Sequence, residues 1–176
     1  MFRCVNESYA MITTTELTFT EAAFVAYLNL IHLCFGDIHP VGTVVELDES
    51  RLSAEIAAGF VSDDEVRYVV LTGRKVSLPG AYTDYVVDYI GRMWPEGEGS
   101  KVAPLLISNL MIKRIIHQGL VLDDKEATDL TLREQLVTGM RQSLAFASEE
   151  KQVQIMKDLN LPTAGTTDTS NEKEVS

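Results

Sequence analysis

The acidic run Asp63-Asp64-Glu65 and the two cysteines, Cys4 and Cys34, are the residues whose types suggest metal binding. A calcium loop needs oxygen ligands that alternate along the chain around a glycine, and this pattern is missing at the acidic run. A zinc site needs closely spaced cysteines or histidines, and the two cysteines belong to no Cys-x-x-Cys or paired Cys/His spacing. Two cysteines in the whole chain are also too few for a disulfide framework to be the basis of the fold. We therefore interpret the acidic run as a solvated turn and predict no metal site.

The three histidines and one glycine-rich segment are the remaining candidates for catalysis or cofactor binding. His32 has no histidine or carboxylate three or four residues further on, so we expect a hydrogen-bonded, half-buried side chain. His39 and His117 are isolated in the same way. Residues 97–100 (Gly-Glu-Gly-Ser) lack the closing Lys-Ser/Thr of a phosphate loop, and the chain has no Gly-x-Ser-x-Gly elbow. The sequence thus predicts a protein that is not an enzyme and has no cofactor.

The charge balance points to a protein partner. Fifteen Lys and Arg stand against 26 Asp and Glu, which gives a formal net charge of −11 at pH 7. Such a chain repels phosphate backbones and anionic lipids, so we expect no nucleic-acid binding.

The most apolar segment, Ala22 to Phe35, is shorter than the roughly 20 residues of a spanning helix, so we expect no membrane insertion. The acidic residues before it do not fit a secretory signal. We expect a cytoplasmic protein with reduced thiols.

The sequence of the N-terminal part predicts an arm followed by one long helix. Residues 1–17 are polar and rich in Thr without a sustained period, which predicts a flexible N-terminal arm; either Met1 or Met11 can be the start. Thr18 and Glu21 have the spacing of a capping box, so a helix is predicted from about Phe19 to Phe35. Gly36 is a natural stop for that helix.

The middle of the chain changes to a period of two, which predicts strands. Four are expected, at about residues 43–47, 66–72, 82–90 and 111–118, with one or two helical turns at 50–58. In the third, Tyr85, Val87 and Tyr89 point to one face, and we expect the face with Asp84, Val86 and Asp88 to be largely solvated. Gly73 is expected to close the second strand. Residues 123–161 return to a helical period, with Leu132, Leu136, Met140 and Leu144 spaced by four and Ser148 as a cap for a restart.

These elements predict an α+β fold: a small antiparallel sheet of about four strands, flanked by the N-terminal apolar helix and one or two C-terminal helices. We place a single domain at residues 18–161, with its most characteristic part at about 40–120. Residues 162–176 have almost no apolar side chains, so we expect a disordered tail.

The apolar helix is the best candidate for partner binding. The stripe Phe24, Leu28, Ile31 and Phe35 is expected to face the core. A second ridge of Tyr27, Leu30 and Cys34 is then left for another protein or a second copy of the chain, unless the sheet and the C-terminal helices cover it. Trp94, before Pro95, is a further candidate, because tryptophan is common at interfaces, although it can equally fill the core.

Five sequence blocks resemble the DUF4176 family over about residues 40–120. They are Gly42-Thr43-Val44-Val45, Gly73-Arg74, Asp88-Tyr89-Ile90-Gly91, Trp94-Pro95-Glu96-Gly97, and the segment from Ile112 to Gly119. Trp94 replaces the usual Tyr, residues 108–111 replace an Asn-His-acidic run, and the segment between the first two strands is longer.

This resemblance implies a small cytoplasmic protein of Gram-positive bacteria, encoded beside type VII secretion genes and LXG-type toxins. It implies an accessory role, as a chaperone or targeting factor that binds a toxin before export, and it carries over no catalytic residue. An immunity protein that neutralises a cognate toxin is the alternative, since it would also be small, acidic and cytoplasmic.

Overall fold

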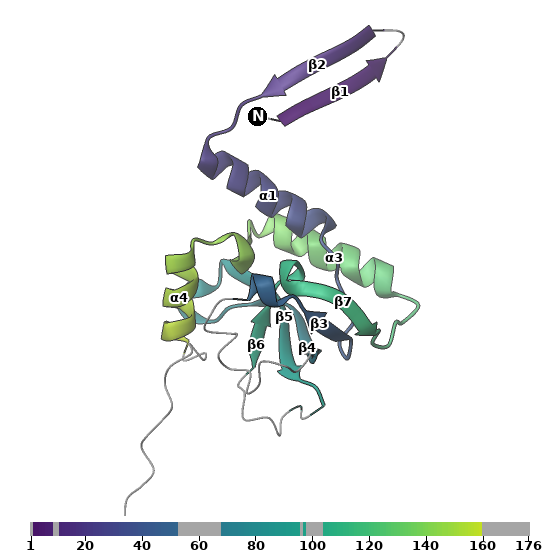
Figure 1. Ribbon diagram of the computed structural model, residues 1–176, viewed down its shortest axis with the longest axis vertical. Helices are drawn as coiled ribbons and strands as arrows, with labels where there is room; N and C mark the ends of the chain where they lie inside the picture. The colour runs from purple at the N-terminus through teal and green to yellow at the C-terminus, as the bar shows by residue number, and fades with distance from the viewer. Residues whose placement is uncertain (1, 9–10, 53–67, 96, 98–103, 160–176) are drawn as a thin grey trace, which may run out of the picture.

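The computed structural model describes residues 2–8, 11–52, 68–95, 97 and 104–159 (Figure 1). In these residues a mixed set of helices and a six-stranded sheet form an α+β fold, as predicted. The sheet has the order β6-β5-β4-β3-β7, and β8 pairs with β5 beside β6. It therefore has more strands than the four expected. The predicted tail at 162–176 and the acidic run at 63–65 lie outside the described residues.

Residues before the first helix pair as two strands, where an arm without regular structure was expected. β1 (Phe2–Ser8) and β2 (Met11–Leu17) are antiparallel, with Phe2 opposite Leu17 and Ser8 opposite Met11. The β-branched residues of this segment, including three consecutive threonines, favour extended backbone even without an alternating apolar pattern. This hairpin extends from the N-terminal end of the first helix (Figure 1).

The apolar helix α1 spans Glu21–Phe35. Its N-cap is Thr20 and not Thr18: the Thr20 hydroxyl accepts a hydrogen bond from the Ala23 backbone N–H at 3.2 Å. The predicted stop at Gly36 is confirmed, since Gly36 N–H donates to the His32 carbonyl at 2.9 Å.

Three strands form the centre of the sheet. β3 (Val44–Leu47), β4 (Tyr68–Ser77) and β5 (Tyr85–Met93) are antiparallel neighbours. β4 does not end at Gly73 as predicted, because a register shift between Leu71 and Gly73 lets it continue past the glycine. The expectation of a largely solvated face on β5 is also wrong for Val86 and Asp88, which are both buried.

Short elements complete the sheet and the loops. β6 (Leu105–Ile107) and β8 (Gln142–Ser143) are paired with β5, and β7 (Ile112–His117) is paired with β3. The described loops also contain short 3-10 helices: η1 (Glu49–Arg51), η2 (Gly80–Tyr82), η4 (Asn109–Met111) and η5 (Leu144–Phe146). Only the first turn of the helical segment expected at 50–58 lies within the described residues.

Two C-terminal helices follow the sheet, as expected. α3 (Lys125–Thr138) lies alongside α1, and α4 (Glu149–Asp158) lies at the β6 edge of the sheet (Figure 1). Ser148 caps α4 as predicted: its hydroxyl accepts from the Lys151 backbone N–H at 3.3 Å. The predicted stripe is only half correct. Leu136 and Leu144 are buried, but Met140 follows the end of α3 with a positive φ of 49° and is exposed.

The core has three adjoining parts. Leu33 of α1, Val86 of β5 and Leu136 of α3 pack together on one face of the sheet. The two larger apolar clusters contain residues of β3, β4, β5 and β6, and Ile155 of α4 packs among Leu78, Val87 and Leu144. In the described part of the chain, no helix is long and apolar enough to cross a membrane.

Candidate functional site

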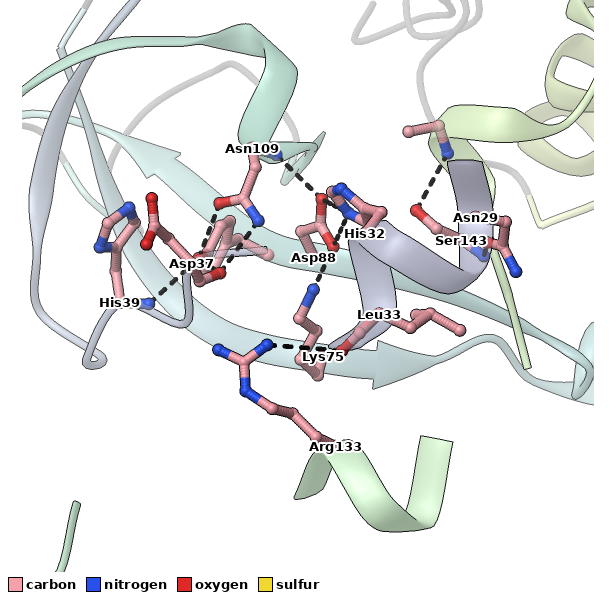
Figure 2. Close-up of polar contacts among 12 residues, drawn as sticks. Asn29, His32, Leu33, Asp37, His39, Lys75, Asp88, Asn109, Arg133 and Ser143 are labelled. Atoms are coloured by element: carbon pink, nitrogen blue, oxygen red, sulfur yellow. Dashed lines mark hydrogen bonds and ion pairs between the residues drawn. The ribbon is translucent and has the colours of Figure 1, made fainter. Parts of the chain in front are cut away.

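A buried polar cluster connects α1 to the centre of the sheet (Figure 2). The Asp88 carboxylate lies 2.8 Å from Nε2 of His32 and 2.5 Å from Nζ of Lys75. It also accepts the backbone N–H of Asn109 at 2.9 Å. The side chains of Asp88 and Lys75 are both 0% exposed. The register of β4 and β5, with Arg74 opposite Tyr89, places Lys75 directly across from Asp88.

The ionisation of Asp88 depends on these contacts. Burial alone would raise the pKa of the Asp88 carboxyl, because a charge is poorly solvated inside a protein. The hydrogen bond from His32 and the charge of Lys75 outweigh burial and hold this pKa below its ordinary value. Asp88 is therefore a carboxylate at neutral pH, with Lys75 as its counter-ion.

A second group of contacts fixes the chain that leaves α1. The Tyr89 hydroxyl donates to the Asp37 carbonyl at 2.7 Å and accepts the His39 backbone N–H at 3.0 Å. The Asn109 side-chain amide also donates to the Asp37 carbonyl, at 2.9 Å. Burial raises the pKa of the Tyr89 hydroxyl, which keeps it protonated and able to donate. These bonds hold the α1–β3 connection against β5.

The polar cluster stabilises the fold and orients α1 on the sheet. Its carboxylate is fully engaged by three donors from α1, β4 and η4. His32 is thus hydrogen-bonded and buried, as its isolation in the sequence suggested. Its partner Asp88 is not evident from the sequence, because it comes from a strand 56 residues further on. Within the described residues, no three His, Cys, Asp or Glu side chains are grouped so that they could hold a metal ion.

The inner face of α1 is consequently more polar than its outer face. Asn29 reaches the last strand, where its Oδ1 accepts the Ser143 backbone N–H at 2.7 Å and its Nδ2 donates to the Arg141 carbonyl at 3.2 Å. Arg133 of α3 donates to the Cys34 carbonyl at 2.8 Å. With His32, these bonds fix which side of the helix faces the sheet.

The predicted core stripe on α1 is therefore wrong at two of its four positions. Ile31 is exposed, and Phe35 is 79% exposed, while Phe24 and Leu28 are half-buried. The residues that the helix buries are His32 and Leu33. The error has a physical cause: a helix that is apolar on nearly every side does not indicate from its own pattern which side is the core.

The predicted partner-binding residues Tyr27, Leu30 and Cys34 lie on the outward side of α1. Leu30 is 47% exposed, Tyr27 is also exposed, and Cys34 is half-buried with a free thiol. The ring of Phe19 stacks on Tyr27 with centroids 5.5 Å apart. We call the residues Tyr27, Leu30, Ile31, Cys34 and Phe35 the outer face of α1. No charged side chain of α1 interrupts it, because Glu21 is at the first position of the helix.

Trp94 is exposed too, but the structure does not bring it to the outer face of α1. Val86, near the start of β5, packs against α1, whereas Trp94 follows the end of that strand. A strand of this length separates the two by roughly 25 Å, at about 3.3 Å per residue. Trp94 is therefore a separate candidate surface.

Fold and site together define a small α+β protein with a buried polar cluster and an exposed apolar helix face. Comparisons with family models, curated proteins and solved structures find no match to this chain. The likeness to the DUF4176 family accordingly depends on the five sequence blocks alone.

Proposed function

We propose that this protein is a non-enzymatic accessory factor that binds another protein through the outer face of α1. The observation that carries the proposal is the exposure of four apolar residues of α1, while Asn29 and His32 of the same helix are turned inward. The four are Tyr27, Leu30, Ile31 and Phe35. Apolar surface that is contiguous and uncharged is typical of protein interfaces. Leu130 and Val137 of the neighbouring helix α3 are exposed as well.

The chemistry of the partner is constrained by the net charge of the chain. The chain carries a net charge of −11, so a partner with an apolar contact surface and a neutral or basic rim fits better than an acidic one. The resemblance to DUF4176 supports a more specific role, as a cytoplasmic chaperone or targeting factor for an LXG-type toxin of a type VII secretion system. An immunity protein for such a toxin is the alternative.

The test uses Leu30→Asp, which places a carboxylate on the outer face of α1. We expect this variant to fold, as judged by circular dichroism, and to lose capture of the partner that the wild-type protein co-purifies from its native host. A buried, unpaired carboxylate is strongly unfavourable in an apolar interface. Leu110→Asp is the matched control, because Leu110 of η4 is 45% exposed against 47% for Leu30.

Each outcome has a defined meaning. Capture that survives Leu30→Asp, or is lost equally with Leu110→Asp, contradicts binding at the outer face of α1 and leaves the Trp94 surface as the next candidate. Sedimentation of the isolated protein separates a homodimer from a complex with another chain. Once the partner is identified as a toxin, an activity assay distinguishes the two roles, since an immunity protein abolishes the toxin's activity and a chaperone need not.

A further inference from the structure

The edge of the sheet is interrupted beside the polar cluster. β6 pairs with β5 at Tyr89 to Gly91, and β8 pairs with the same side of β5 at Tyr85 and Val86. In the part of the chain that the structure describes, no strand is paired with Val87 or Asp88 on that side. Ser108 follows the last residue of β6, and Ser143 ends β8. The two serines therefore lie on either side of the interruption.

A small cavity of about 80 Å³ occupies this interruption. Its walls are mainly apolar and come from β5, β6, η5 and α4, among them Val87, Leu106, Leu144, Val153 and Met156. For comparison, an engineered apolar cavity of about 150 Å³ takes up benzene. The cavity can hold a molecule of only a few non-hydrogen atoms.

Two hydroxyl groups in this cavity are left without full hydrogen bonding. Ser108 is buried, and its side chain makes no hydrogen bond with any described residue, even though it occupies the N-cap position of η4. The Ser143 hydroxyl accepts only a long bond of 3.4 Å from the Ala145 backbone N–H, so its proton is free to donate. A buried hydroxyl without a partner is unfavourable, and such groups in proteins usually have a ligand or water.

The charges around the cavity decide which kind of head group fits. Asp88 also lines it, but its carboxylate is already neutralised by Lys75 and satisfied by His32 and Asn109. Among the described residues that line the cavity, no buried charge is therefore left without a counter-ion. Glu149 on the α4 side adds a negative charge that disfavours anions. The groups without full hydrogen bonding are neutral: they are the two serine hydroxyls and the amide of Gln152, whose Nε2 donates to the Ala147 carbonyl.

We infer that this cavity is a binding site for a small uncharged molecule with a short apolar chain and one hydrogen-bonding head, of the class of short-chain alcohols and primary amides. The head exchanges hydrogen bonds with the hydroxyls of Ser108 and Ser143. The apolar chain lies against Leu106, Leu144 and Met156. This site is distinct from the outer face of α1 and does not depend on the proposed function.

The experiment is an NMR titration of the full chain with 1-propanol, which follows the backbone amides. We expect saturable shifts at Val87, Ser108 and Ser143. Ser108→Ala should weaken 1-propanol about three- to tenfold, the usual effect of one hydrogen bond. Ser77→Ala is the matched control, because Ser77 is exposed on β4 and should leave the affinity unchanged. Xenon, which has no head group, should bind wild type and Ser108→Ala equally.

Three results would overturn the inference. The first is the absence of saturable shifts with 1-propanol, which would mean that the cavity holds only water. The second is equally tight binding of propionate, because an anion should be excluded. The third is a lower melting temperature for Ser108→Ala in the absence of ligand: removal of an unpaired hydroxyl should leave the melting temperature unchanged or raise it, so a fall would show that Ser108 has an internal partner.

Discussion

Replacing Asp88 by Asn tests the polar cluster most directly. Asn has nearly the same shape as Asp, so packing around β5 is preserved, but the negative charge is lost. The Lys75 ammonium then has no counter-ion, and its side chain is 0% exposed, so water cannot solvate it. The amide oxygen of the introduced side chain can still accept one hydrogen bond, from His32 or from the Asn109 backbone.

The expected loss of stability is about 3–5 kcal/mol, the usual effect of removing one partner of a buried ion pair. For a chain of 176 residues this corresponds to a fall in melting temperature of about 6–20 °C. Asp84→Asn is the matched control, because Asp84 immediately precedes β5, the strand that carries Asp88. Asp84 is 87% exposed and lies 3.8 Å from Arg141, so its loss should change stability by less than about 1 kcal/mol.

Urea denaturation followed by circular dichroism measures both variants. The double variant Lys75→Met with Asp88→Asn should recover about 1–3 kcal/mol of the loss, because no unpaired charge remains. Met keeps the length of Lys and places no new demand on the backbone, which has a φ of 45° at this position. A single Asp88→Asn variant as stable as Asp84→Asn, or a double variant less stable than the single, would refute a buried, mutually dependent pair.

The same pair predicts a specific pH dependence. The pKa of Asp88 is lower in the folded protein than in the unfolded chain, where it is about 3.9. The stability that the carboxylate contributes is therefore fully present above about pH 4 and is lost as the pH falls through the lower, folded pKa. Acid unfolding should consequently be steeper in the wild type than in the double variant, which lacks this carboxyl group.

Two further substitutions test local packing and capping. Gly91→Ala should destabilise the protein by about 1–3 kcal/mol in thermal melts, because a Cβ there would overlap Val69 and lie 2.6 Å from Cδ1 of Ile107; an unchanged melting temperature would mean that the β4–β5–β6 contact is looser than described. Ser148→Ala should cost about 1 kcal/mol through loss of the α4 N-cap, and Ser148→Asp should restore it; equal melting of all three proteins would exclude a capping role.

Local signals in the sequence are sufficient for the end of α1, the start of α4 and the class of fold. The break at Gly36 and the cap at Ser148 are confirmed, because glycine and serine act on backbone groups within a few residues. The N-cap of α1 was placed two residues too early: Thr18 and Thr20 are both capping residues, and the sequence alone does not rank them. The strands β6 and β8 have three and two residues, too few to show a period.

Long-range contacts account for most of what the sequence did not reveal. Asp88 alternates with apolar residues on β5, which normally indicates a solvated face, and its burial depends on Lys75 and His32 from two other elements. In a sequence, a carboxylate that will be buried cannot be distinguished from an exposed one unless its counter-ion is known. The Ser108 cavity likewise exists only because β6 and β8 stop on either side of Val87 and Asp88.

The orientation of α1 links the polar cluster to the proposed function. Burial of apolar surface is worth about 25 cal/mol per Å², so on that basis alone the helix would turn Tyr27, Ile31 and Phe35 inward. The structure has the opposite arrangement, in which His32 and Asn29 face the sheet. Hydrogen bonds are directional and a buried carboxylate without donors is very costly, so these contacts select one rotation of the helix. Asp88→Asn weakens only the His32 part of this preference, since the Asn29 bond to β8 remains, and it should therefore shift α1 partly toward a rotation that turns its apolar side to the core. Asp88→Asn, which leaves every residue of the outer face unchanged, is thus expected to reduce partner capture as well as stability.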